Sequence, residues 1–206
     1  MSIKRIKKII EELDEGKQVG TLYHFTNADK FIHILKDNSL KSSRRQPDNG
    51  YGGYGYISFT RDKNFNKIPR GSISGTAIVF IVDGDKLSNR FKIEPFNYYN
   101  YASKSNPERV EAEERVVGKG IYAVEGMEIP NFLNYVTDII VYKDKFLQEM
   151  RIGGMLRSER RDLRDELGLN IENGELDAPN IQIANQFYEA FMKYLNDNHI
   201  RYEVIE

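Results

Sequence analysis

The chain has 206 residues, of which 40% are hydrophobic and 30% charged, and its formal net charge is -1. This balance is too apolar for a disordered chain, and no apolar run approaches the roughly 18 residues that a membrane span needs. The absence of cysteine excludes disulfides, thiolate zinc sites and a cysteine nucleophile, and three histidines leave little material for a metal centre. We therefore expect a soluble, cytoplasmic protein that uses no metal and contacts no membrane.

Short strands and helices alternate irregularly in the N-terminal half. Hydrophobic residues at helical spacing predict an amphipathic helix over residues 2–15 and a second helix that is capped by Asn27 or Asp29 and ends near Asn38. The Gly- and Tyr-rich stretch 42–55 predicts a loop. Short apolar runs predict strands at Thr21–Phe25, Tyr56–Thr60, Thr76–Val82 and Phe91–Glu94, the third of them buried on both faces.

The C-terminal half contains fewer strands and more helix. An ordered element from Glu108–Glu114 is expected to run into Arg115–Val117. Two helical segments over 144–167, hinged at Gly153-Gly154, a helix over 181–198, and strands at Ile139–Tyr142 and Tyr202–Ile205 complete the chain. Many short strands without regular βαβ alternation indicate an α+β fold, and we expect residues 1–206 to form a single domain.

Positive charge is concentrated in one segment. Between Lys36 and Arg70 there are eight Lys or Arg against three Asp, which gives +5 and leaves -6 for the rest of the chain. This asymmetry suggests an anionic ligand, such as a pyrophosphate or a nucleic-acid backbone, and a solvated loop without a partner is the alternative. The charged helix that ends at Leu167 carries both signs equally, and we interpret it as a solvated face or a partner surface.

Three dispersed motifs carry the functional signal: YHFT at 23–26, YISFTRD at 56–62 and EAEERVV at 111–117. In this order they resemble the ADP-ribosyltransferase superfamily. The stretch LYHFTNADKFIHILKDNSLKSS is most similar to its DarT-type and RNA 2'-phosphotransferase branches, which suggests a phage or toxin–antitoxin origin. The resemblance covers roughly residues 20–142 and leaves 143–206 as a helical extension. It implies a split, mostly antiparallel sheet with flanking helices, and NAD as the substrate.

The resemblance also implies a role for each motif. Glu113 would stabilise the oxocarbenium-like ribose that forms when nicotinamide leaves, as in glycoside hydrolysis. Glu111, on the same strand face, would orient or deprotonate the acceptor, unless a bulge exchanges these positions with Glu114. His24 would bind the ribose hydroxyls of adenosine. The other residues expected to contact NAD are Phe25, Thr26, Tyr56, Ser58, Thr60 and Arg61.

Each motif also has a purely structural interpretation. His24 could be a buried histidine whose ring is satisfied by a backbone carbonyl. The EAEER run could be a solvated acidic helix end, and Ser58 and Thr60 could be ordinary strand residues. The neighbouring tyrosines at 98, 99 and 101 could stack on bases or pack beside the sheet.

Together these features predict an NAD-dependent ADP-ribosyltransferase that modifies a macromolecule, with nucleic acid slightly favoured over protein. The resemblance raises an antitoxin or another regulatory protein as a further partner. Two alternatives remain open: an RNA 2'-phosphotransferase-like enzyme, and an inactive interaction module of the same fold.

Overall fold

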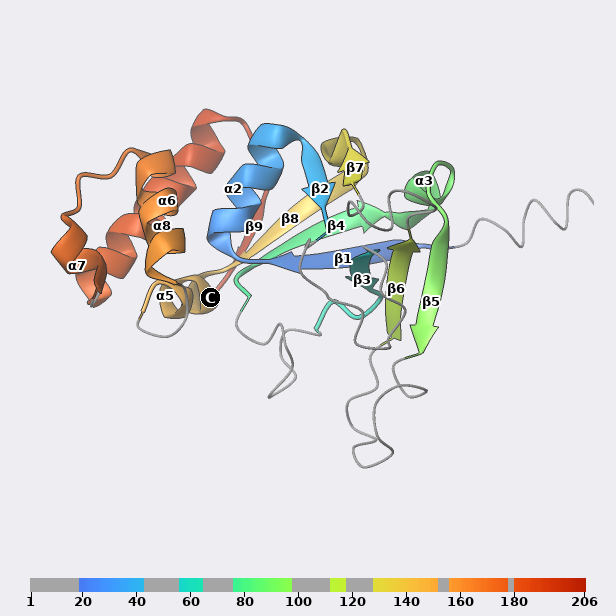
Figure 1. Ribbon diagram of the computed structural model, residues 1–206, viewed down its shortest axis with the longest axis horizontal. Coiled ribbons are helices and arrows are strands. Elements are labelled where there is room, and N and C mark those ends of the chain that lie inside the picture. The colour runs from blue at the N-terminus through green and yellow to red at the C-terminus, as the bar shows by residue number, and fades with distance from the viewer. Residues whose placement is uncertain are drawn as a thin grey trace, which may run out of the picture.

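The computed structural model describes residues 19–42, 56–64, 76–97, 112–117, 128–151, 156–177 and 180–206. Within these ranges the chain has a mixed α+β fold, in which helices flank a mostly antiparallel sheet (Figure 1). The described part of the sheet has seven strands in the order β5-β6-β3-β1-β4-β8-β9, and its one parallel pair is β8 with β9. The expected α+β class and mostly antiparallel sheet are therefore confirmed.

The sheet strands are short and follow the order of the chain irregularly. They are β1 (Thr21–Thr26), β3 (Tyr56–Thr60), β4 (Ile78–Asp83), β5 (Ile93–Asn97), β6 (Ala112–Val117), β8 (Val136–Tyr142) and β9 (Glu203–Ile205). A separate two-stranded ladder joins β2 (Ser39–Lys41) to β7 (Glu128–Pro130). The helices are α2 (Ala28–Asp37), α3 (Gly84–Ser88), α5 (Lys143–Glu149), α6 (Arg157–Leu167), α7 (Asn173–Asp177), α8 (Ile181–Asp197) and the 3-10 helix η4 (Phe132–Asn134).

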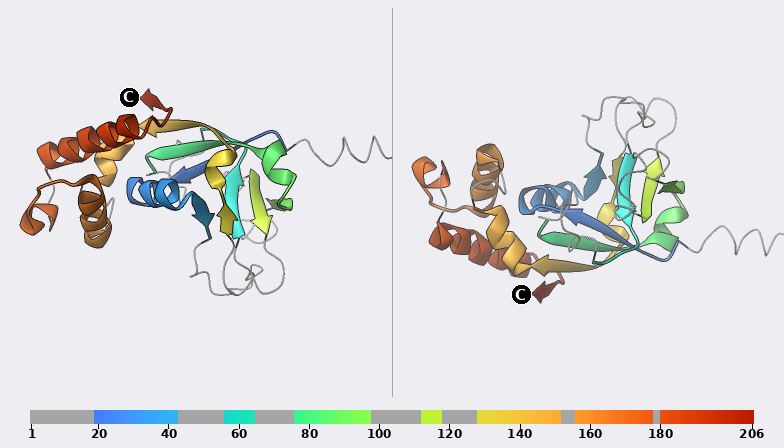
Figure 2. Two further views of the ribbon diagram at one scale, coloured as in Figure 1. Left: turned by 90° about the horizontal axis from the view of Figure 1, so that it is seen from above. Right: turned by 90° about the horizontal axis from the view of Figure 1, so that it is seen from below.

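The main sheet divides between β1 and β3. Every residue of β1 is paired with β4, whereas the described register between β1 and β3 consists of the single pair Tyr23 and Thr60. Accordingly, β3, β6 and β5 run steeply across the direction of β1, β4 and β8 (Figures 1 and 2). The two halves of the sheet meet where the YHFT and YISFTRD motifs lie.

Helix α2 covers one face of the sheet beside this division. It begins after Asn27, as the sequence predicts, although the Asn27 side chain makes no capping hydrogen bond. The helix ends at Asp37, and the C-cap residue Asn38 has a left-handed φ of 47°, a conformation that Asn tolerates better than most residues. Phe31 on its inner side stacks on Phe80 of β4, with ring centroids 4.9 Å apart.

Strand β4 is buried on both faces. Phe80 belongs to the main core, which includes α2 and α8, and Val79 belongs to a second cluster with Phe25, Ile140 and Tyr142 on the opposite face. Both side chains are fully buried. This confirms the interpretation of the apolar run that ends at Val82, although the strand begins at Ile78 and not at Thr76.

The helical extension packs on the core through its apolar side chains. Helix α8 buries Ile183, Phe187, Phe191 and Leu195, as its spacing predicts. Helix α6 ends at Leu167, and the C-cap residue Gly168 follows in the left-handed conformation with a φ of 65°. Strand β9 then pairs with β8, which ties the end of the chain to the sheet.

The interpretation of α6 as a solvated face is wrong for two of its arginines. Arg160 is 5% exposed, and its Nε donates to the carbonyl of Leu176 at 3.0 Å. Arg164 Nη1 donates to the carbonyl of Ile171 at 3.1 Å. The balanced charges of α6 do not indicate which arginines donate hydrogen bonds to the carbonyls of Ile171 and Leu176. The segment that carries these carbonyls folds back onto α6 only in the tertiary structure.

The remaining differences concern short elements and shifted boundaries. Sequence periodicity did not predict β2, β7, α3, α7 or η4, because three to five residues are too few to establish a period. Strand β5 begins at Ile93, two residues late, and β8 begins at Val136, three residues early. The expected helix over 2–15, residues 43–55 of the expected loop and the hinge at Gly153-Gly154 lie outside the described residues.

Candidate functional site

The three strands that carry the motifs are direct neighbours, in the order β6-β3-β1. In their register Tyr23 is opposite Thr60, and Thr60 is opposite Glu113. The antiparallel ladder therefore brings together residues that are 37 and 53 positions apart in sequence. The three motifs therefore lie on neighbouring strands of one sheet.

His24 is half-buried among aromatic side chains at the division of the sheet. Its ring centroid lies 5.5 Å from that of Phe59, 6.5 Å from Phe80 and 6.4 Å from Phe132. Its Nδ1 lies 3.0 Å from the carbonyl oxygen of Ser58 in β3. The ring thus bridges β1 and β3 where their backbone ladder stops.

The hydrogen bond to Ser58 fixes the protonation of the His24 ring. A carbonyl oxygen only accepts, so Nδ1 carries the hydrogen and donates it. Burial lowers the pKa of the imidazole below its ordinary value, and the bond to Ser58 opposes this only in part. At neutral pH the ring is therefore neutral, and Nε2, which has no hydrogen-bonding partner among the described residues, is an acceptor.

The other expected NAD contacts of β1 do not share one environment. Phe25 is 9% exposed and packs in the second cluster, on the face opposite to His24. Thr26 is buried at the end of β1, just before the cap residue of α2. His24 and Thr26 therefore lie on the α2 side of the strand, and Phe25 lies on the opposite side.

Ser58 and Thr60 of β3 make hydrogen bonds within the protein, and they are better placed for this than for direct contact with a ligand. Thr60 is 3% exposed, and its Oγ1 accepts the backbone N–H of Asp62 at 3.1 Å. Ser58 contributes its carbonyl oxygen to His24. Arg61 is exposed just after the end of the strand.

Several predicted residues lie partly or wholly outside the described residues. Glu111 is one of them, and so are the tyrosines at 98, 99 and 101. The backbones of Tyr56 and Glu113 lie in β3 and β6, and their side chains are outside the description. Their roles stay predictions.

The structure adds a buried carboxyl cluster that the sequence did not indicate. Glu149, at the end of α5, is 4% exposed and accepts the backbone N–H of Ala77 at 2.6 Å and of Ala28 at 3.2 Å. Asp29, in the first turn of α2, is 7% exposed, and its Oδ1 has no hydrogen-bonding partner. No pattern joins residues 120 positions apart, so only the fold could show this pair.

Burial raises the pKa of both carboxyls of this cluster. Burial raises the pKa of Glu149 to about 8, which outweighs its two N–H donors, and the neighbouring Asp29 raises it further. Burial also raises the pKa of Asp29. The pair joins the first turn of α2 to α5 and to the start of β4, which makes it a structural anchor of the helical extension.

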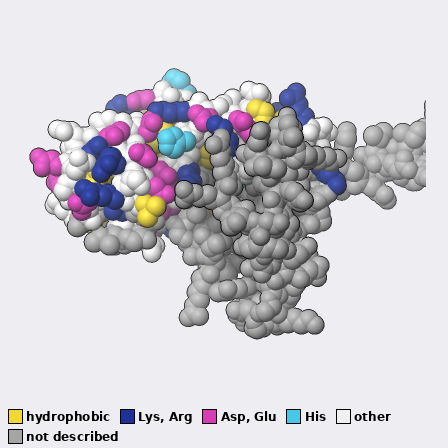
Figure 3. All heavy atoms as spheres, viewed as in Figure 1, with side chains coloured by type: hydrophobic (Ala, Val, Ile, Leu, Met, Phe, Trp, Pro, Cys, Tyr) yellow, Lys and Arg dark blue, Asp and Glu magenta, His cyan; other side chains and the backbone are white. Residues whose placement is uncertain are grey.

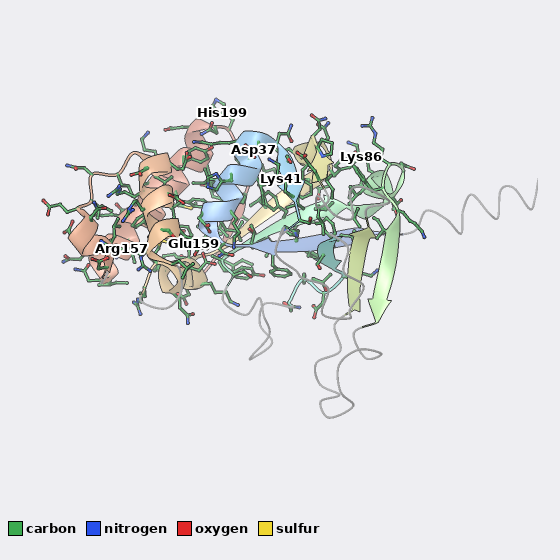
Figure 4. All side chains as sticks on the ribbon, in the orientation of Figure 1. Asp37, Lys41, Lys86, Arg157, Glu159 and His199 are labelled. Carbon is green, nitrogen blue, oxygen red and sulfur yellow. The ribbon has the colours of Figure 1, made fainter. Side chains whose placement is uncertain are left out.

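Charges on the viewed face are mixed in sign over the described helices (Figure 3). Two lysines of the basic segment are paired. Lys36 pairs with Glu166 of α6, and Lys41 pairs with Asp37 at 2.8 Å, next to it in Figure 4.

No group of three or more His, Asp or Glu within the described ranges is arranged to hold a metal ion. Nor is any helix there long and apolar enough to cross a bilayer.

Comparisons with protein-family models, curated proteins and solved structures found no match. The chemistry available at the division of the sheet therefore has to be inferred from its own residues. These are a neutral histidine acceptor in β1, a hydroxyl-bearing strand β3, and the acidic run of β6 next to it.

Proposed function

We propose that the protein is an NAD-dependent ADP-ribosyltransferase that modifies a macromolecule. The observation that carries this proposal is the state of His24: a neutral ring whose Nδ1–H is committed to Ser58 and whose Nε2 is left as an acceptor, at the point where β1 and β3 diverge. The acidic run of β6 lies one strand further along the same sheet.

A neutral imidazole acceptor selects a ligand group that donates a hydrogen bond. Ribose hydroxyls are such donors, whereas a phosphate at neutral pH is an acceptor and would need a protonated ring. Because burial holds the pKa of His24 low, the site fits a ribose hydroxyl of a dinucleotide better than a phosphate. This favours ADP-ribosyl transfer over the RNA 2'-phosphotransferase alternative.

The reaction would use the carboxylates of β6 electrostatically. The bond between the ribose C1' and the nicotinamide nitrogen breaks, and its electron pair leaves with nicotinamide, which becomes neutral. The cationic ribose is stabilised by a nearby carboxylate and captured by a nucleophile of the acceptor, which releases a proton. No metal is required for these steps.

The acceptor in this proposal is a macromolecule. The +5 segment between Lys36 and Arg70 and the tyrosines that follow β5 favour nucleic acid over protein. Within the described ranges of this segment, Lys36 and Lys41 are paired with carboxylates, and Arg61 and Lys63 are exposed. Either kind of acceptor would be labelled when the protein is incubated with labelled NAD and a cell extract.

The first test measures NAD binding and nicotinamide release by the full chain. NAD at 100 times its dissociation constant should stabilise the wild type by about 2.7 kcal/mol in thermal melts. His24→Ala should lose this stabilisation and the release of nicotinamide. The matched control is His33→Ala, because His33 is exposed on α2 and should leave both unchanged.

The pH dependence of binding separates the alternatives. A hydroxyl bound by neutral His24 should bind equally well from pH 7 to 8 and more weakly once the pH falls through the lowered pKa of the ring, because a protonated ring accepts no hydrogen bond. A phosphate bound there would instead bind more tightly as the pH falls. If NAD neither shifts the melt nor loses nicotinamide, the protein is an interaction module and the proposal is refuted.

A further inference from the structure

The face of the sheet opposite α2 carries hydrophobic side chains that stay partly exposed. The second cluster lies on this face, whereas the described helices α2 and α6 lie on the other side of β1, β4 and β8 (Figure 2). None of the described helices lies over the strands on this face. Three side chains pack against the second cluster and are only half-buried: Tyr23 of β1, Ile81 of β4 and Ile205 of β9. We call these three residues the rear patch.

Acidic side chains border the rear patch. Asp138 is opposite Ile81 in the ladder of β4 and β8, and Glu203 is opposite Ile140 in the pair of β8 and β9. Residues that are paired in this way share a face of the sheet, so both carboxylates lie on the same face as the patch. Arg201 pairs with Asp138 at 3.4 Å, and Glu203 is exposed. A segment that covers the patch should therefore be apolar towards the sheet and basic beside β8 and β9.

The N-terminal segment of the chain has this chemistry. Residues 2–15 lie outside the described residues, and their sequence predicts an amphipathic helix with the apolar stripe Ile3, Ile6, Ile10 and Leu13. Residues 2–8 include four Lys or Arg, and residues 9–15 include four Asp or Glu. This charge order is the reverse of the one that the helix dipole favours, and an isolated helix of this length is marginal in water. Packing of the apolar stripe therefore has to stabilise it.

We propose that the helix over residues 2–15 docks on the rear patch, with its basic first half beside β8 and β9. The described chain reaches the sheet at Val19, whose N–H donates to Asp85 at 2.7 Å next to the start of β1. The four residue steps from 15 to 19 span up to about 14 Å, which is enough for a layer that packs about 10 Å from the sheet.

The length of the helix places its charges correctly. Two and three strand spacings separate β1 from β8 and β9, which corresponds to about 10 and 14 Å. Positions 8 to 4 lie about 10–17 Å from position 15 along a helix. A helix that enters beside β1 and crosses β4 thus brings its basic half to Asp138 and Glu203. It packs on the face of β1 opposite to His24, and this inference does not depend on the proposed function.

The test uses cysteine pairs, because the chain has no cysteine of its own. Ile81→Cys in the rear patch is combined with Ile6→Cys, with Ile10→Cys or with the control Lys8→Cys, which lies on the opposite side of the helix. A short bismaleimide joins two nearby thiols. Within the monomer, the pairs with positions 6 and 10 should crosslink about tenfold faster or more than the pair with position 8. In urea the three pairs should react alike.

Equal rates for the three pairs under native conditions would overturn the inference. Crosslinks that join two molecules would overturn it as well, because a second copy would then cover the patch. If Ile81→Cys does not fold, Ile205→Cys takes its place. Neither outcome bears on NAD, so the proposed function is judged separately.

A second measurement needs no cysteine. Ile10→Ala should lower the melting temperature of the full chain by about 2–4 °C, because it removes packing from the apolar stripe. Lys8→Ala, on the opposite side of the helix, should leave the melting temperature unchanged. Equal melting temperatures of the two variants would contradict the docking of the stripe.

Discussion

Gly84 illustrates how closely two backbone segments approach at the start of α3. Its N–H donates to the carbonyl of Gly20 at 2.9 Å. A Cβ at this position would overlap that same carbonyl oxygen and lie 2.9 Å from side-chain atoms of Leu22 and Val19. The side chain of Asp85 strengthens the approach by accepting the N–H of Val19 at 2.7 Å and of Gly20 at 3.0 Å. Because position 84 has no side chain, its backbone can lie directly against that of Gly20, the residue before β1.

The substitution Gly84→Ala should destabilise the protein by about 1–3 kcal/mol, because backbone atoms must move to admit the methyl group. Gly174→Ala is the matched control: nothing lies within 4 Å of a Cβ there, and the residue is in α7. The control should be neutral or slightly stabilising. Urea unfolding of both variants measures the difference, and equal stabilities would contradict the close approach.

At the scale of elements, Glu149 joins three of them through one carboxyl group. Its two oxygens accept N–H groups from the first turn of α2 and from the residue before β4, while the residue itself ends α5. The Ala28 N–H is one of the donors that a helix N-terminus leaves without an intrahelical partner. A side chain from the helical extension thus serves as the cap that Asn27 does not provide.

The raised pKa of Glu149 predicts a pH-dependent stability. A carboxyl with a pKa of about 8 in the folded protein and 4.5 when unfolded stabilises the fold at low pH, and this contribution is lost as the pH rises through 8. Between pH 4.5 and about 8, each pH unit lowers the free energy of unfolding by up to about 1.4 kcal/mol. Asp29, whose pKa is also raised, titrates in the same direction, and Lys30 opposes both.

Urea unfolding at pH 6 and pH 8 checks this prediction. The wild type should lose stability between the two pH values, and Glu149→Gln should lose clearly less, although it starts less stable because its amide NH₂ faces an N–H donor. The control Glu189→Gln, exposed on α8, should keep the wild-type difference. A Glu149→Gln variant with the full wild-type difference would show that Glu149 is ionised in the folded protein.

At the scale of the whole molecule, the helical extension and the sheet share one aromatic core. The ring of Phe191 in α8 lies 5.5 Å from Phe31 of α2 and 5.0 Å from Phe146 of α5. Phe31 in turn stacks on Phe80 of the sheet. The aromatic contacts therefore run from β4 through α2 to the last helix without interruption.

This continuity predicts that the described core unfolds in one step. Phe191→Ala should lower the free energy of unfolding by about 3–5 kcal/mol, whereas Gln186→Ala, exposed on the same helix, should have little effect. The chain has 13 tyrosines and no tryptophan, so tyrosine fluorescence and far-UV circular dichroism are the two probes. Their transitions should coincide in the wild type, and separate transitions would indicate that the extension unfolds independently.

Local patterns were sufficient for the elements that are long or strongly periodic. Helix α8 is 17 residues long, and its buried face could be identified from spacing alone. Strand β3 was predicted at its observed bounds, because Pro- and Gly-rich sequence precedes it and an Arg-Asp pair follows. The order of the three functional motifs along the chain is likewise a property of the sequence.

What the sequence by itself determined is thus which residues form the main elements, together with a histidine, a hydroxyl-bearing strand and an acidic run in that order. Only the tertiary structure decided that β6, β3 and β1 are neighbours, that the Nδ1 of His24 is held by Ser58, and that Glu149 caps α2. The physical reason is that side-chain spacing follows from local backbone geometry, whereas register, tautomer and burial depend on segments that meet only when the chain folds.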